Sequence, residues 1–165
     1  MRVLGIDTSL RSTGIGVVEA EGNCLRAVTR RTIKAPRDRP VSECLRRLNE
    51  GIAEVIETTA AEEAAVEGGF YCRNVRTAMV LGEARGAAIA SCASQGVAVY
   101  EYSPRRVKQA VVGTGSADKS QVRRMLMSIL GLREEPGEDE GDALAIAVCH
   151  LHSRTSYQAL QPESI

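Results

Sequence analysis

The sequence predicts an α/β fold built on a mixed five-stranded sheet, in which a three-strand antiparallel meander is joined by parallel strands and flanked by helices. Three strand-like runs follow one another near the start of the chain, and two later apolar runs alternate with helical patterns. Strands that are connected by helical crossovers run parallel. The chain has 165 residues, of which 44% are hydrophobic, and no internal linker, so we expect a single domain over residues 1–153.

The meander begins at residues 3–6, an apolar run that is too short for a helix and is followed by Asp7. We expect a polar turn at residues 8–13, a second strand at 14–18 and a third at 25–35. Glycines in the second strand allow another backbone or a ligand to approach closely. Asp7 is therefore either part of a cation site in the sheet or an acid that caps its own turn.

The middle of the chain alternates a helix, a strand and a helix. After Pro40, Ser42 is a candidate N-cap for a helix whose apolar stripe consists of Leu45, Leu48, Ile52, Val55 and Ile56. Residues 64–67 form a short apolar run ending in an acid, which predicts a buried strand with Glu67 at its C-terminal end. The longest helix is expected at residues 74–93.

Small residues recur along one face of that longest helix, where Gly82, Gly86 and Ala90 are spaced four apart. Each glycine inside a helix costs about 0.8–1.0 kcal/mol relative to alanine, so two on one stripe need a reason. Close approach of another helix is that reason, and the helix belongs either to the same chain or to a second subunit. We favour a homodimer.

The last predicted strand covers residues 97–100 and leads into helices. Pro104 is suited to a helix start, so a short helix is expected at 105–112. Ser116 is the expected cap of the next helix, whose apolar stripe consists of Val122, Met125, Leu126, Ile129 and Leu130.

A final helix is predicted at residues 138–151, after the helix-breaking pair Pro136 and Gly137. Its expected core face consists of Leu144, Ala147, Val148 and Leu151. The polar residues 154–165 show no periodicity, so a flexible tail is expected there.

Composition points to a cytoplasmic protein. The five cysteines are an odd number without a C-x-x-C pair, which predicts neither a disulfide framework nor a zinc site. There is no uncharged apolar run of about 18 residues and no signal-peptide pattern. Net charge is zero, but residues 26–47 hold eight basic residues and two acids, whereas 132–142 hold six acids and one arginine. Such blocks predict either a basic face beside an acidic cluster or an ordinary mixed surface.

Four carboxylates are candidates for a metal site. Asp139 and Asp142 lie about 60° apart around the last helix, on one edge of its first turn, where acids also simply favour the helix dipole. Asp7 and Glu67 lie in or at the end of predicted strands. Convergence of four acids requires a cation, and oxygen ligands without Cys or His indicate Mg²⁺, with Mn²⁺ as a substitute. Two ions about 3.5–4 Å apart would suit hydrolysis of a phosphodiester.

Several stretches of the sequence resemble one family. They are GIDTSLRSTGIGVV, AVEGGFYCRNVRTAMVLGEARG, VKQAVVGTGSADKSQV and DEGDALAIAVCH. Together they resemble the bacterial RuvC family of Holliday junction resolvases, within the RNase H-like superfamily, and the resemblance extends to about Ser153. It implies an RNase H-like fold and makes Asp7, Glu67, Asp139 and Asp142 the metal-binding catalytic acids.

The resemblance also implies a reaction and its partners. Members of the family cut two opposed strands of a four-way DNA junction as homodimers with one site per subunit. They leave ends that a ligase can seal, and they work with the branch-migration proteins RuvA and RuvB. For this chain the expected activity is paired, symmetric, Mg²⁺-dependent cleavage of junctions in DNA recombination and repair.

Basic residues near the predicted site are candidates for phosphate contact. Lys119 lies at the start of a helix, where its charge opposes the helix dipole, and an approaching phosphate would explain it. The resemblance makes Lys108 and Lys119 functional lysines. The other candidate DNA contacts, each of which is otherwise an ordinary solvated side chain, are Arg76, Arg105, Arg106, Ser116, Arg123 and Arg124.

Phe70 is the single phenylalanine of the chain and follows two glycines, with Tyr71 beside it. An aromatic side chain in such a loop is suited to stacking on an unpaired base, and the related family carries an aromatic residue here that enters the junction. The alternative is an ordinary core aromatic.

Two other functions remain open from the sequence. The G-I-D-T-S stretch and the glycine-rich strand resemble the phosphate loop of ATP-binding domains of the sugar kinase and actin type, although that fold requires two such domains. A junction-binding protein without catalysis is the other alternative, and the four acids argue against it.

Overall fold

The computed structural model describes residues 1–68, 74–154 and 162–165. Within them the chain forms five strands and five helices. In chain order these are β1 (Arg2–Asp7), β2 (Ser12–Glu21), β3 (Cys24–Lys34), α1 (Val41–Thr59), β4 (Glu63–Glu67), α2 (Val75–Ser94), β5 (Ala98–Tyr102), α3 (Pro104–Val112), α4 (Lys119–Leu130) and α5 (Glu138–Ser153).

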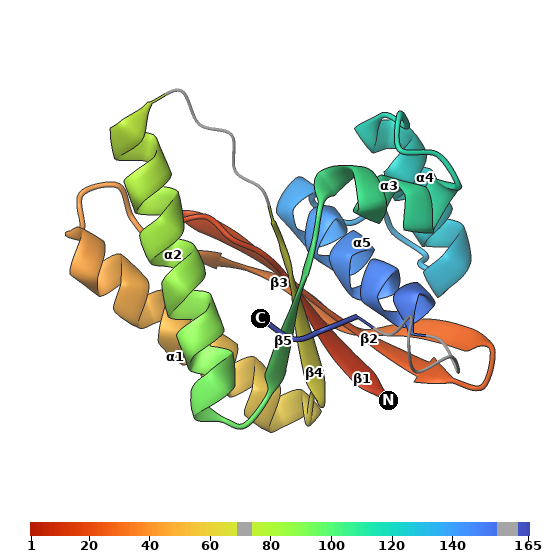
Figure 1. Ribbon diagram of the computed structural model, residues 1–165, viewed down its shortest axis with the longest axis horizontal. Coiled ribbons are helices and arrows are strands. Elements are labelled where there is room, and N and C mark those ends of the chain that lie inside the picture. Colours follow the sequence, from red (N-terminus) through yellow and green to blue (C-terminus); the bar gives the residue numbers. More distant parts are fainter. Residues whose placement is uncertain (69–73, 155–161) are drawn as a thin grey trace.

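All five strands form one mixed sheet in the order β3-β2-β1-β4-β5. The first three strands pair antiparallel as a meander, while β4 pairs parallel with β1 and β5 pairs parallel with β4. Helices α1 and α2 cover one face of the sheet, and α5 covers the other with α3 and α4 packed outside it (Figure 1). The predicted fold class and strand directions are therefore confirmed.

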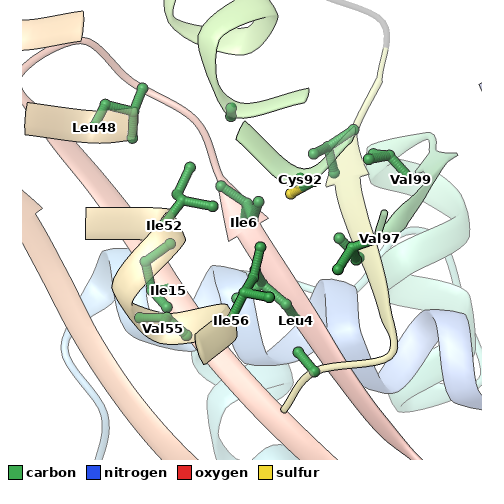
Figure 2. Close-up of a cluster of buried hydrophobic side chains, with 14 of the residues drawn as sticks. Leu4, Ile6, Ile15, Leu48, Ile52, Val55, Ile56, Cys92, Val97 and Val99 are labelled. Carbon is green, nitrogen blue, oxygen red and sulfur yellow. The ribbon is translucent and has the colours of Figure 1, made fainter. Parts of the chain in front are cut away.

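The core on the α1 and α2 side is formed by alternate residues of the strands and by one stripe of α1. Alternate residues of the sheet, among them Leu4, Ile6 and Ile15, meet one stripe of α1 that includes Leu48 and Ile52 (Figure 2). All five side chains are at most 2% exposed. The stripe predicted for α1 thus faces the sheet.

On the other face, α5 lies directly on the backbone of the central strands. Gly5 of β1 and Gly16 of β2 are opposite each other in the sheet. A Cβ atom at Gly5 would lie 2.8 Å from the amide nitrogen of Ala147, and one at Gly16 would lie 2.9 Å from that of Leu144. These glycines therefore make room for the backbone of another element. The sequence alone allowed either a backbone or a ligand here.

Several predicted boundaries are wrong in detail. Strand β2 begins at Ser12, so the turn after β1 is shorter than expected. Pro40 occupies the N-cap of α1, which places Ser42 inside the first turn. Asp118 caps α4 in place of Ser116. Its carboxylate accepts a hydrogen bond from the backbone amide of Gln121, and the side-chain oxygen of Gln121 accepts one from the backbone amide of Asp118.

The end of the chain lies against β5. Ser164 forms an isolated antiparallel bridge with Tyr100, and the amide of Ile165 donates to the carbonyl of Val99 at 2.9 Å. The flexible character of residues 154–165, and the extent of the domain, stay predictions. In the described ranges, no helix has the length and apolar character needed to cross a membrane.

Candidate active site

Two of the four candidate acids lie at one edge of the sheet because their strands are parallel neighbours. Ile6 of β1 pairs with Val66 of β4, so Asp7 and Glu67 follow at the same edge. Asp7 in turn is opposite Gly14 of β2. A Cβ atom at Gly14 would overlap the backbone carbonyl of Asp139, so the start of α5 lies over this pair and brings its own acids to the edge.

The other three carboxylates lie near enough to Asp7 for their charges to act on it. Burial raises the pKa of Asp7 to about 7, and the charges of Asp142, Glu67 and Asp139 add to the rise. Burial, followed by the charge of Asp142, also raises the pKa of Glu67. Like charges gathered in a partly buried place favour protonation unless a cation compensates them.

Two of the carboxylates are held by protein groups. The hydroxyl of Ser12, at the start of β2, donates to Asp139. The ammonium group of Lys119 donates to Asp142 at 3.0 Å and to Glu138 at 2.7 Å. These two hydrogen bonds raise the pKa of Lys119, which therefore stays charged. The positive charge of Lys119 is unfavourable at the N-terminus of α4, and its attraction to Asp142 and Glu138 offsets that cost.

A cleft of about 250 Å³ joins the acids to both candidate lysines. Its polar side chains are Glu67, Lys108, Lys119 and Asp142. The remaining walls are apolar and come from α3, α4 and α5, namely Pro104, Val107, Val122, Ala145 and Ile146. A phosphate in this cleft would meet two cations beside two acids.

The carboxylates suit a hard divalent cation in their chemistry, because all four present oxygen ligands. In the part of the chain that the structure describes, however, no three His, Cys, Asp or Glu side chains stand close enough to form a ready metal-binding group. Two of the four carboxylates instead accept hydrogen bonds from protein donors, Asp139 from Ser12 and Asp142 from Lys119.

The other candidate DNA contacts do not line this cleft. Arg105 lies against Gly115, Arg106 donates to the hydroxyl of Ser153 at 3.4 Å, and Ser116 is hydrogen-bonded to Thr114. Arg123 forms an ion pair with Glu135 at 3.5 Å.

Three further candidates are Arg76, Phe70 and Tyr71. Arg76 is exposed in the first turn of α2. Phe70 and Tyr71 fall outside the described residues, so the stacking role predicted for them stays a prediction.

The small-residue stripe of α2 faces outward. A Cβ atom at Gly82 or Gly86 would meet nothing within 4 Å, and Ala90 is exposed. The stripe continues into Val75 and Met79, whose side chains are 74% and 62% exposed. No described residue therefore packs closely on these two glycines, and the second-subunit interpretation stays a prediction.

Ser12 and Glu138 are site residues that sequence reasoning missed. Ser12 falls in the stretch predicted as a polar turn, where a hydroxyl is ordinary, and only the position of α5 brings Asp139 to it. Glu138 is 64% exposed and precedes Asp139, but its partner Lys119 comes from another helix. The two predicted lysines, by contrast, do lie beside predicted acids.

A family model described as crossover junction endodeoxyribonuclease RuvC matches residues 3–150. A crossover junction endodeoxyribonuclease RuvC of Halorhodospira halophila is 46% identical over 155 residues, which cover 94% of this chain and 92% of the relative. That of Marinobacter nauticus is 47% identical over 154 residues, covering 93% and 87%.

Solved structures agree with the sequence relatives. Thermus thermophilus RuvC in complex with a Holliday junction substrate superposes with a TM-score of 0.91 at 34% identity, covering 100% of this chain and 99% of that one. A fowlpox virus Holliday junction resolvase superposes with a TM-score of 0.61 at 6% identity, covering 93% and 99%, which shows a shared fold alone.

Proposed function

The chain belongs to the RuvC family of crossover junction endodeoxyribonucleases, and we propose that it resolves four-way DNA junctions by paired, symmetric cuts in recombination and DNA repair. The observation that carries this proposal is the gathering of Asp7, Glu67, Asp139 and Asp142 at one sheet edge, beside a cleft with two lysines. A carboxylate cluster next to cations is suited to a reaction on a phosphodiester.

The four acids would hold the metal, which we propose to be two Mg²⁺ ions, with Mn²⁺ able to replace them. When bound, such ions lower the pKa of a water molecule and stabilise negative charge on the phosphate oxygens. The acids provide the hard oxygen ligands that these cations prefer. The raised pKa of Asp7 supports this assignment, since burial and the three neighbouring acids outweigh the compensating charge of Lys119.

The lysines act on the phosphate. The hydrogen bonds from Lys119 to Asp142 and Glu138 raise its pKa and hold it at the acids before the DNA arrives. Lys108, from α3, lines the same cleft and provides a second cation for the negative charge that grows during hydrolysis. Ser12 orients Asp139 through its hydroxyl.

Recognition of the junction would use the surface around this cleft. We propose that Phe70 and Tyr71 stack on bases at the crossover, and that Arg76, Arg105, Arg106, Ser116 and Arg123 contact phosphates or sugars. Contacts to phosphates and sugars position the DNA but do not distinguish its base sequence.

Paired cuts require two active sites, which a homodimer provides. The outward stripe of Gly82, Gly86 and Ala90 supports dimerisation through α2, because its glycines leave room for a backbone. By family membership we propose RuvA and RuvB as partners and the cytoplasm as the site of action.

The ATP-binding alternative finds no support in the sheet. The face of the sheet at Gly14 and Gly16 is covered by Asp139 and Leu144 of α5, so it is not open to a ligand. A junction-binding protein without catalysis is distinguished by an experiment on the acids.

That experiment compares the chain with its Asp7→Asn, Glu67→Gln and Asp142→Asn variants on a labelled four-way junction. With Mg²⁺ the unchanged chain should cut the junction, and the three variants should bind it without cutting. Asp139→Asn should have the mildest defect, because the neighbouring carboxylates of Glu138 and Glu140 could partly replace the lost one. Both are held by other groups in the free chain, Glu138 by Lys119 and Glu140 by Arg30 and the amide of Gly137. Binding without any cutting by the unchanged chain would favour the non-catalytic alternative.

A further inference from the structure

A second basic surface lies on the other side of the acids. It is a hollow of about 620 Å³ whose cations are Arg11, Lys34, Arg37 and Arg47, with Ser12 and Pro36 among its other walls. We call it the basic hollow. In the sheet order, Ser12 and Lys34 belong to β2 and β3, on one side of β1, whereas Glu67 belongs to β4 on the other. The basic hollow therefore lies on one side of the sheet edge that carries the acids, and the cleft with Lys108 and Lys119 lies on the other.

Arg11 is fixed in the basic hollow by uncharged partners. Its guanidinium donates to the carbonyls of Pro36 at 2.5 Å and Arg39 at 3.0 Å, and to the sulfur of Cys44 at 2.9 Å. The backbone amide of Ala35 donates to the backbone carbonyl of Arg11 at 3.0 Å, which ties the end of β3 to Arg11. No described carboxylate pairs with Arg11, so its charge is positioned but not neutralised.

The other cations of the basic hollow are also largely uncompensated. Lys34 and Arg37 are exposed and have no carboxylate within 4 Å in the described ranges. Arg47 pairs with Glu43 at 3.3 Å, and none of the described residues that line the hollow is acidic. Its volume is that of a ligand pocket, but such pockets are mostly apolar. Its lining instead suits several phosphate groups.

The basic hollow is continuous with the acids through a single residue. Ser12 lines the hollow and also donates its hydroxyl to Asp139. Lys34 is the partner of Ser12 in the pairing of β2 with β3, so a cation stands next to that serine. A polyanion with one phosphate at the acids would therefore have cations of the hollow within reach of its next phosphates.

We propose that the basic hollow binds the phosphate backbone of the junction arm next to the cut, on the side of the acids away from Lys108 and Lys119. This inference rests on the proposed function, since it takes the acid edge as the place of cleavage. The hollow acts by holding DNA and does not take part in the chemistry. Its removal should weaken binding without lowering the cleavage rate at saturation.

The test uses the full chain with Lys34→Ala and Arg37→Ala combined. Both side chains are exposed, so folding should not change. The matched control combines Arg26→Ala and Arg46→Ala, which removes the same charge from exposed residues outside the hollow, each of them paired with a glutamate. Junction binding is measured without divalent metal over a range of salt concentrations, and cleavage is then measured with Mg²⁺ at saturating protein.

The hollow variant should bind the junction at least about tenfold more weakly than the control. The slope of its binding affinity against salt concentration should be shallower by an amount that corresponds to about one to two phosphate contacts. Adding Lys34→Arg to the Arg37→Ala background should retain more binding than Lys34→Ala, because charge is what counts. Equal binding by the hollow variant and the control would overturn the proposal, and would point to a protein partner for the hollow. Cleavage by the unchanged chain tests the proposed function separately.

Discussion

Gly14 lies beneath the backbone carbonyl of Asp139, so closely that a Cβ atom at position 14 would overlap it. The same hypothetical atom would be 3.1 Å from the Cα of Asp139. Because Gly14 is opposite Asp7 in the sheet, this contact sets the distance between the acid of β1 and the acids of α5. A residue without a side chain thus determines how the candidate site is assembled.

Gly14→Ala should therefore damage both stability and cleavage. The added methyl group meets backbone atoms that cannot turn aside, and overpacking of this kind costs about 1–3 kcal/mol. Gly141→Ala is the matched control, because its Cβ would lie 3.5 Å from side-chain carbons of Arg123 and Pro136. That variant should keep or improve stability, since alanine favours a helix. Equal urea midpoints for the two variants would argue against the contact.

The pKa of Asp7 predicts a pH dependence of stability in metal-free protein. Its pKa is raised to about 7 from an ordinary 3.8, so the folded chain holds a proton that the unfolded chain releases between these values. The contribution of Asp7 to the free energy of unfolding should then fall as pH rises from about 4 to 7 and stay low above.

Asp7→Asn removes this group, so its stability relative to the unchanged chain should increase across the same interval. Urea unfolding of both chains in a chelator checks the difference. Mg²⁺ should raise the melting temperature of the unchanged chain more than that of Asp7→Asn. A difference between the chains that does not vary with pH would show that Asp7 is ordinarily ionised.

Lys119 and Glu138 should differ in their effects although they contact each other. Lys119→Ala removes a charge from the cleft and releases Asp142, so cleavage should slow strongly at every salt concentration and for every junction sequence. Glu138→Gln leaves the bond between Lys119 and Asp142 in place and should cut within a few-fold of the unchanged chain. Single-turnover rates measure both, and equal loss in the two variants would contradict the role given to Lys119.

Gly86→Leu tests the dimer. A Cβ atom at position 86 would meet no described residue within 4 Å, so a loss of dimers would indicate contact with a second chain. Overpacking at a contact costs about 1–3 kcal/mol, and sedimentation should show folded monomers. Thr77→Leu is the control and should stay dimeric, because Thr77 is exposed and lies on the opposite side of α2 from Gly86. A folded dimer of normal mass for Gly86→Leu would place the interface elsewhere.

The framework of the site was predictable from sequence because it depends on periodicity and connection rules. Short apolar runs ending at Asp7 and Glu67, joined by a helical crossover, imply neighbouring parallel strands with both acids at one edge. The predicted stripe of α1 likewise faces the core. Caps were less predictable, since Ser42 and Ser116 compete with Pro40 and Asp118 for the same role within a few residues.

Contacts between distant elements could not be predicted. The bonds of Lys119 to Asp142 and Glu138 depend on how α4 packs against α5, and no spacing in one sequence encodes that geometry. The basic hollow is a similar case, because Arg11, Lys34 and Arg47 meet only after the meander and α1 have folded together. The block of basic residues at 26–47 indicated charge there, but not its position beside the acids.

The most direct test of the account is cleavage of a labelled four-way junction beside a linear duplex of the same sequence, each with and without Mg²⁺. The unchanged chain should nick two opposed strands of the junction symmetrically, only when the metal is present, and should leave the duplex intact. Glu67→Gln should leave both substrates uncut. Equal cutting of the junction and the duplex, or cutting that persists in a chelator, would contradict the account.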